Sequence, residues 1–114
     1  MNYNISKLAD VNPNFATELK QKCYKIVGLC QQVHKEIFHD KQIRHKHYAD
    51  FLVGNDILIE CKAIEHLGPE QRQQLWNYMR LSGICVGILY NFAPVRDQCE
   101  RYYLDQTTGH MYAF

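Results

Sequence analysis

The chain has 114 residues, of which 46% are hydrophobic and 22% charged, and its formal net charge is +1 at pH 7. This size and balance are typical of one globular domain over residues 1–114, and they argue against intrinsic disorder. No apolar run approaches the roughly 18 residues of a membrane span and the N-terminus lacks a signal-peptide pattern, so we expect a cytoplasmic protein with no membrane contact. The cysteines form no C-x-x-C pair, which indicates reduced, buried thiols.

The first predicted element is a long amphipathic helix. Residues 1–12 carry little pattern, whereas Asn12 followed by Pro13 is typical of a helix N-terminus. From Phe15 to Ile37, apolar residues recur at steps of three and four, which predicts a helix of about six turns.

A short basic segment follows this helix at residues 38–46. Its cations Lys41, Arg44 and Lys46 would contact the phosphates of a nucleic acid if the segment lies beside an active site. The alternative interpretation is a solvated loop or edge strand.

The next stretch predicts a β-hairpin. Two runs of high β-propensity, Tyr48 to Val53 and Asp56 to Ala63, are joined by Gly54-Asn55. Because glycine stands first in this connection, we expect a type II′ turn.

The charges of the hairpin suggest a metal site. Side chains alternate along a strand, so Glu60 and Lys62 share one face. Asp50, on the partner strand, could lie beside them. Two carboxylates are suitable ligands for Mg²⁺, and a lysine can position a water or offset charge on phosphorus. The alternative is a solvated acid–base pair on an exposed strand.

A second helix is predicted to begin at Pro69 and to end at Gly83. Gln74 and Tyr78 fall on its inward side, together with the apolar residues. A glutamine there is either hydrogen-bonded within the core or directed at the same site as Glu60.

The remaining elements are strands. Ile84 to Asn91 is a nearly continuous apolar run, which predicts a central strand buried on both faces, and Arg101 to Asp105 with His110 to Phe114 predicts a second hairpin. The order helix, strand, strand, helix, strand plus this hairpin predicts an α/β (α+β) fold with a mixed sheet flanked by helices.

The C-terminal strand also bears on oligomeric state. Placed at a sheet edge, it would expose Met111, Tyr112 and Phe114. Unprotected edges tend to be covered or paired, most often across a two-fold axis, so we expect a homodimer or a chain that works beside a partner.

Three segments carry a resemblance to a known family. They are YADFLV with IECKAI, then QLWNYMRLSG, then VGILYNF, and together they span residues 48–92. In order and spacing they resemble the GxxExxY protein family, a branch of the PD-(D/E)XK nuclease-like superfamily. Residues 26–37 resemble the opening helix of that family.

The resemblance implies a restriction-endonuclease-like core that hydrolyses phosphodiester bonds of DNA or RNA. It implies metal ligands at Asp50 and Glu60, a catalytic lysine at Lys62 and a site-facing glutamine at Gln74. The backbone carbonyl of Cys61 would complete the metal ligands. The expected ion is Mg²⁺, with Mn²⁺ as the alternative.

The chain departs from the family pattern after the first helix. The segment with Glu and Tyr three residues apart, which gives the family its name, is missing before the strand that carries Asp50. Glu18 and Glu36 are alternative sources of that acid. Two further hypotheses therefore stay open: a catalytically degenerate module that binds nucleic acid or a protein partner, and a structural ion-pair cluster of Asp50, Glu60 and Lys62.

Overall fold

The computed structural model describes residues 5–38, 47–93 and 96–114, with the backbone alone for residues 30, 32–38 and 47–51. Its strands are β1 (Ser6–Lys7), β2 (His47–Val53), β3 (Ile57–Lys62), β4 (Val86–Asn91), β5 (Gln98–Leu104) and β6 (Met111–Ala113). Its helices are α1 (Leu8–Val11), α2 (Pro13–Phe38) and α3 (Pro69–Ser82). The basic residues Lys41, Arg44 and Lys46 lie outside the described part of the chain.

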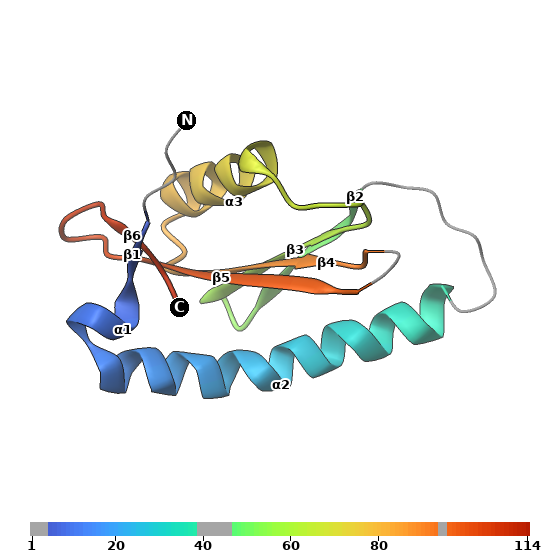
Figure 1. Cartoon of the computed structure of the whole chain (residues 1–114), viewed down its shortest axis with the longest axis horizontal. Coiled ribbons are helices and arrows are strands. Elements are labelled where there is room, and N and C mark those ends of the chain that lie inside the picture. Colours follow the sequence, from blue (N-terminus) through green and yellow to red (C-terminus); the bar gives the residue numbers. More distant parts are fainter. Residues whose placement is uncertain (1–4, 39–46, 94–95) are drawn as a thin grey trace.

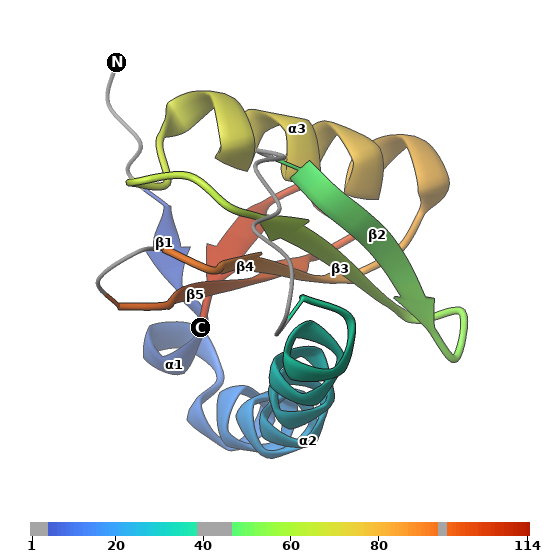
Figure 2. The same cartoon turned by 90° about the vertical axis from the view of Figure 1, so that its right-hand side faces the viewer.

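Within the described residues, the strands form a six-stranded sheet in the order β1-β6-β5-β4-β3-β2 (Figure 1). Strand β3 pairs with β4 in parallel, β1 pairs with β6 in parallel, and the remaining neighbours are antiparallel. Helix α2 runs along one face of the sheet and α3 lies on the other (Figures 1 and 2). The predicted mixed α/β fold is confirmed, and it is consistent with a restriction-endonuclease-like core.

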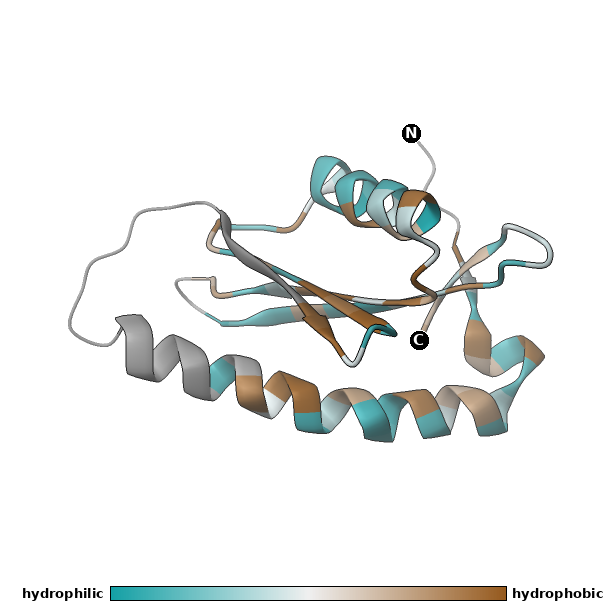
Figure 3. Ribbon diagram, turned by 180° about the vertical axis from the view of Figure 1, so that it is seen from behind, coloured by the Kyte–Doolittle hydropathy of each residue, from teal (hydrophilic) through white to brown (hydrophobic). Residues whose placement is uncertain are grey.

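Strand β3 divides its side chains between two hydrophobic cores. Ile57, Ile59 and Cys61 pack on the α2 face, and Leu58 packs on the α3 face. The helices contribute Leu19, Cys23 and Ile26 from α2, and Leu75, Trp76 and Met79 from α3. Figure 3 shows the middle of the sheet as hydrophobic and the outer side of α3 as largely hydrophilic. The alternation predicted for this strand is therefore confirmed.

The central position predicted for the run ending at Asn91 is also confirmed. Strand β4 lies between β3 and β5, and all six of its residues are buried. Where cysteine side chains are described, at positions 23, 61, 85 and 99, none forms a disulfide.

Helix α2 begins where the sequence predicts. The Asn12 side chain accepts a hydrogen bond from the Phe15 N–H at 3.2 Å, and Pro13 is the first helical residue. Asparagine satisfies an N–H that the first helical turn leaves without an intrahelical acceptor, and proline needs no such acceptor. The helix extends to Phe38, one residue beyond the last predicted apolar position.

The turn of the first hairpin differs from the expected type. Gly54 and Asn55 both have positive φ values, 61° and 65°, which is the combination of a type I′ turn rather than type II′. Asparagine adopts the left-handed backbone conformation more readily than most residues. Asn55 can therefore have the positive φ that a type I′ turn requires at its second central position.

The N-terminal residues contradict the expectation of an exposed C-terminal edge. Ser6 pairs with Tyr112 and Lys7 pairs with Ala113, so β1 covers the outer side of β6. Strand β6 is therefore internal, and the edges of the described sheet are β1 and β2. Because β6 is not an edge strand, it cannot pair with a second copy of the chain in the way the sequence suggested.

Helix α3 has the predicted ends but a different inward side. The Gly68 N–H donates to the Gln71 side chain at 2.7 Å, Pro69 begins the helix, and Gly83 ends it with φ 76°. Tyr78, expected to face inward, is 51% exposed, and Trp76 is buried in its place. The buried stripe of α3 thus lies toward β4 and β5, and Tyr78 stands over the β3 side of the helix, where a groove opens.

Over residues 5–38, 47–93 and 96–114, none of the helices combines the length and the apolarity that crossing a membrane requires.

Candidate active site

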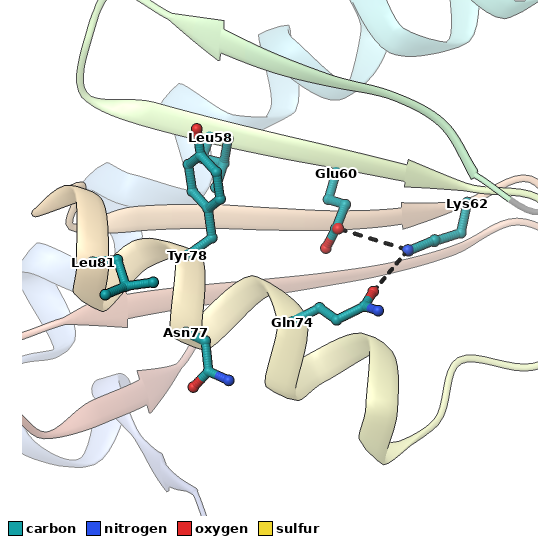
Figure 4. Close-up of a pocket in the computed structure, with 7 residues that line it drawn as sticks. All are labelled: Leu58, Glu60, Lys62, Gln74, Asn77, Tyr78 and Leu81. Atoms are coloured by element: carbon teal, nitrogen blue, oxygen red, sulfur yellow. Dashed lines mark hydrogen bonds and ion pairs between the residues drawn. The ribbon is translucent and has the colours of Figure 1, made fainter.

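A groove of about 570 Å³ lies between strand β3 and helix α3. Its lining residues are Leu58, Glu60 and Lys62 from β3, and Gln74, Asn77, Tyr78 and Leu81 from α3 (Figure 4). The polar residues of β3 and Gln74 gather at one end, whereas Leu58, Tyr78 and Leu81 lie toward the other (Figure 4).

The polar end of the groove is organised around Lys62. Its Nζ donates to Gln74 Oε1 at 3.0 Å and lies 3.6 Å from Glu60 Oε1. The side chains of Lys62 and Glu60 are only 8% and 10% exposed. A buried ammonium loses much of its hydration, and such polar partners offset part of that cost. This ion pair is shielded by the fold, unlike the solvated pair considered as an alternative above.

The backbone places Asp50 on the same face as Glu60. The two residues are direct partners in the antiparallel register of β2 and β3. Directly paired residues of an antiparallel sheet belong to one face, and Glu60 lines the groove on that face. The structure describes Asp50 by its backbone alone.

Close packing of α3 on the sheet sets the width of the groove. A Cβ added at Gly87 of β4 would lie 2.5 Å from Met79 Sδ and 3.1 Å from a Leu75 methyl carbon. Glycine at this position therefore allows α3 to approach β4 closely. That approach brings Gln74 within hydrogen-bonding distance of Lys62.

Asn91 holds the connection between β3 and α3. Its side chain is fully buried, accepts the Ile64 N–H at 2.9 Å and donates to the Ile64 carbonyl at 2.9 Å. It also donates to Gln98 Oε1 at 2.9 Å, and that oxygen accepts the Leu67 N–H at 3.2 Å. These bonds hold the segment that follows β3 against the end of β4, so Asn91 is part of the scaffold of the groove.

An ion pair fixes α3 to β5. Arg72 donates from Nε and a terminal nitrogen to the two carboxylate oxygens of Glu100, at 2.7 and 2.8 Å, and the Tyr102 hydroxyl donates to the same carboxylate. Burial alone would raise the pKa of Glu100, but the hydrogen bonds from Arg72 and Tyr102 outweigh it and hold that pKa below its ordinary value. The bidentate geometry anchors the first half of α3, which carries Gln74.

The structure separates several predicted residues from this groove. Cys61 is 2% exposed and its side chain lies in the core on the α2 face, so only its backbone remains available to a metal. Glu18 is exposed on α2, which packs on the opposite face from Lys62. The side chain of Glu36 lies outside the described part.

Four lining residues were not predicted as part of the site: Leu58, Asn77, Tyr78 and Leu81. A sequence signal for one of them exists, because Tyr78 follows Gln74 by four residues and such pairs share one side of a helix.

The donor set fits a hard divalent cation. Mg²⁺ is commonly bound through one or two carboxylates with several waters, and Asp50 and Glu60 supply that number on paired strands. Among the side chains that the structure describes, no group of three His, Cys, Asp or Glu residues could hold a metal ion.

Comparison with known families agrees with this geometry. The family model described as the PD-(D/E)XK nuclease superfamily matches residues 14–102, which include β2, β3, α3 and β4. No curated protein and no solved structure matches the chain.

Proposed function

Because this chain belongs to the PD-(D/E)XK nuclease superfamily, we propose that it is a divalent-metal-dependent nuclease that hydrolyses phosphodiester bonds of DNA or RNA. The observation that carries the proposal is the contact of the buried Lys62 with Glu60 and Gln74, with Asp50 in register opposite Glu60. Two acids can hold a divalent cation and a lysine can stabilise charge on a phosphate, so these groups on one face of a hairpin suit phosphodiester hydrolysis.

Each residue of the cluster has a distinct proposed role. Asp50, Glu60 and the backbone carbonyl of Cys61 would hold Mg²⁺ or Mn²⁺, which supplies positive charge that polarises the phosphate. Lys62 would position the attacking water and offset charge that develops on the phosphate oxygens. Gln74 acts through Lys62, because its side-chain oxygen holds the ammonium at 3.0 Å.

Two further proposals concern the residues that contact the substrate and the branch of the superfamily to which the chain is related. Lys41, Arg44 and Lys46 would contact phosphates on either side of the scissile bond. The motifs in residues 48–92 support a relationship to the GxxExxY proteins within the superfamily.

A non-catalytic module is the second candidate function. It is favoured by the missing Glu and Tyr segment and by the position of Glu18, which the fold does not bring to the groove. In that case the same fold would bind nucleic acid or a protein partner without cleaving it.

The homodimer remains a prediction, now with a different edge. Strand β2 has seven residues and lies at one edge of the described sheet, whereas β1 has two. The longer edge is the one where a second copy would add strands. Light scattering at micromolar concentration should give twice the 13.5 kDa mass of the chain, and a monomer mass would contradict the pairing.

A cleavage assay distinguishes the two functions. Labelled single-stranded and double-stranded DNA and RNA are incubated with Mg²⁺, with Mn²⁺, or with a chelator. We expect metal-dependent cleavage that falls about a hundredfold or more in Lys62→Met. Lys22→Met is the matched control, because Lys22 is exposed on α2 and pairs with Asp56 away from the groove. Binding without cleavage under every metal condition would support the non-catalytic module instead.

A further inference from the structure

The apolar end of the groove has no role in the chemistry proposed above. Tyr78 is 51% exposed and Leu81 is 89% exposed, although both border a concave surface. Leu52, the register partner of Leu58, is 53% exposed on the same face of the hairpin. Large apolar side chains gathered at a hollow, rather than scattered singly, indicate a binding surface.

Tyr78 lines the groove from the same side of α3 as Gln74. It follows Gln74 by one helical turn, a spacing at which Cβ atoms are about 5–6 Å apart on one side of a helix. Gln74 in turn holds Lys62. Figure 4 shows the Tyr78 ring reaching from α3 toward β3, where Leu58 lies. The groove thus has an ammonium at one end and an aromatic ring at the other.

This pairing matches the chemistry of one nucleotide. A nucleotide carries an anionic phosphate and a flat apolar base on the same sugar, and the groove offers a cation for the first and a ring for the second. Its volume of about 570 Å³ lies within the usual range for sites that hold one small ligand. Asn77, which also lines the groove, has an amide that can donate to and accept from the edge of a base.

We propose that the Tyr78 end of the groove binds an unstacked nucleobase beside the scissile phosphate, so that the substrate is single-stranded at the cleavage site. This inference rests on the proposed nuclease function. A base inside a duplex has both faces covered by its neighbours and cannot also stack on a protein ring. Stacking on aromatic side chains is a general way in which proteins hold single strands.

Quenching of 2-aminopurine reports such stacking directly. Single-stranded oligonucleotides that contain this fluorescent base, as DNA and as RNA, are titrated with protein in the presence of a chelator, so that cleavage does not interfere. We expect quenching with the natural chain and with Tyr78→Phe. Tyr78→Ala should weaken binding by about 5- to 150-fold, the equivalent of roughly 1–3 kcal/mol for one stacked base. Tyr24→Ala is the control, because Tyr24 is 62% exposed on α2.

Duplexes of the same sequence provide the second comparison. Their affinity should be equal for the natural chain and Tyr78→Ala, because a paired base does not reach the ring. Equal single-strand affinity for these two proteins would overturn the base site, and so would an equal loss for single strands and duplexes, or an absence of quenching with the natural chain.

The two proposals fail separately. Tyr78-dependent quenching without metal-dependent cleavage would retain the base site and reject the nuclease. Cleavage by Tyr78→Ala with unchanged KM and unchanged preference for single strands would retain the nuclease and reject the base site. Circular dichroism melting of each variant checks that the exposed substitution leaves the fold intact.

Discussion

Gln74 Oε1 accepts a 3.0 Å hydrogen bond from Lys62 Nζ, and this bond joins helix α3 to strand β3 across the groove. Gln74 is otherwise exposed on its helix, whereas Lys62 is buried. The amide oxygen therefore serves to fix an ammonium that solvent does not surround. A positioned charge stabilises a transition state better than one that must reorient during the reaction.

Replacing Gln74 tests this positioning role. In Gln74→Ala the ammonium of Lys62 loses an acceptor, so we expect kcat to fall about tenfold or more while KM and melting temperature change little. Gln73→Ala is the matched control, because Gln73 is the adjacent exposed glutamine of α3 and does not line the groove. Equal kcat values for the two variants would remove Gln74 from the mechanism.

The sequence was sufficient to predict the parts of the site that depend on local periodicity. Strand alternation placed Glu60 and Lys62 on one face, and the residues flanking the second helix marked its start at Pro69 and its end at Gly83. The pairing of Ser6 with Tyr112 could not be predicted in this way, because a two-residue strand has no detectable pattern and its partner is distant in the chain.

Tyr78 shows a second limit of sequence-based reasoning. Helical periodicity predicts which residues share one side of a helix. The neighbouring strands determine which of those residues are buried against the sheet. Trp76 packs edge-on against the Tyr102 ring on β5, and this contact turns Tyr78 toward the open groove. Inferring that orientation required knowledge of the strand order.

Metal binding should be visible in thermal stability. A cation that binds only the folded chain stabilises it by about 2.7 kcal/mol at a concentration of about one hundred times its Kd. We expect Mg²⁺ to raise the melting temperature of the natural chain by several degrees and to have little effect on Glu60→Gln, which loses a ligand charge. Glu65→Gln, at an exposed position just after β3, should respond as the natural chain does. An equal magnesium response in all three proteins would place the cation elsewhere.

The Arg72–Glu100 pair predicts a dependence of stability on pH. The folded-state pKa of Glu100 lies below its ordinary value of 4.5, so its ion pair contributes stability above about that pH. This contribution should disappear as pH falls through the lowered pKa, because protonation removes the charge that Arg72 binds. Arg72→Met should therefore be less stable than the natural chain near neutral pH, by about 1–3 kcal/mol, and the difference should shrink in acid.

Urea denaturation across a pH series measures this difference. Arg80→Met is the control, since Arg80 is exposed in the last turn of the same helix. Arg80→Met should change the free energy of unfolding only slightly, and this change should not vary with pH as Glu100 becomes protonated. The loss of unfolding free energy in Arg72→Met could instead stay constant from neutral pH to below the ordinary pKa of Glu100. In that case the Glu100 carboxylate would not be the source of the stabilisation.

Gly87 should be the most sensitive glycine for the geometry of the groove. A methyl group there would lie 2.5 Å from Met79 Sδ and 3.1 Å from a Leu75 methyl carbon, so Gly87→Ala should displace these two side chains and, through them, α3. Overpacking of this kind costs about 1–3 kcal/mol, and the displacement would lengthen the Lys62–Gln74 bond and lower activity with it. Gly28→Ala is the matched control, because a Cβ on that helical glycine meets nothing within 4 Å and alanine favours helix by up to about 1 kcal/mol. Denaturant titration of both variants should thus give free-energy changes of opposite sign, and a Gly87→Ala variant as stable as the natural chain would show that α3 does not depend on this close approach.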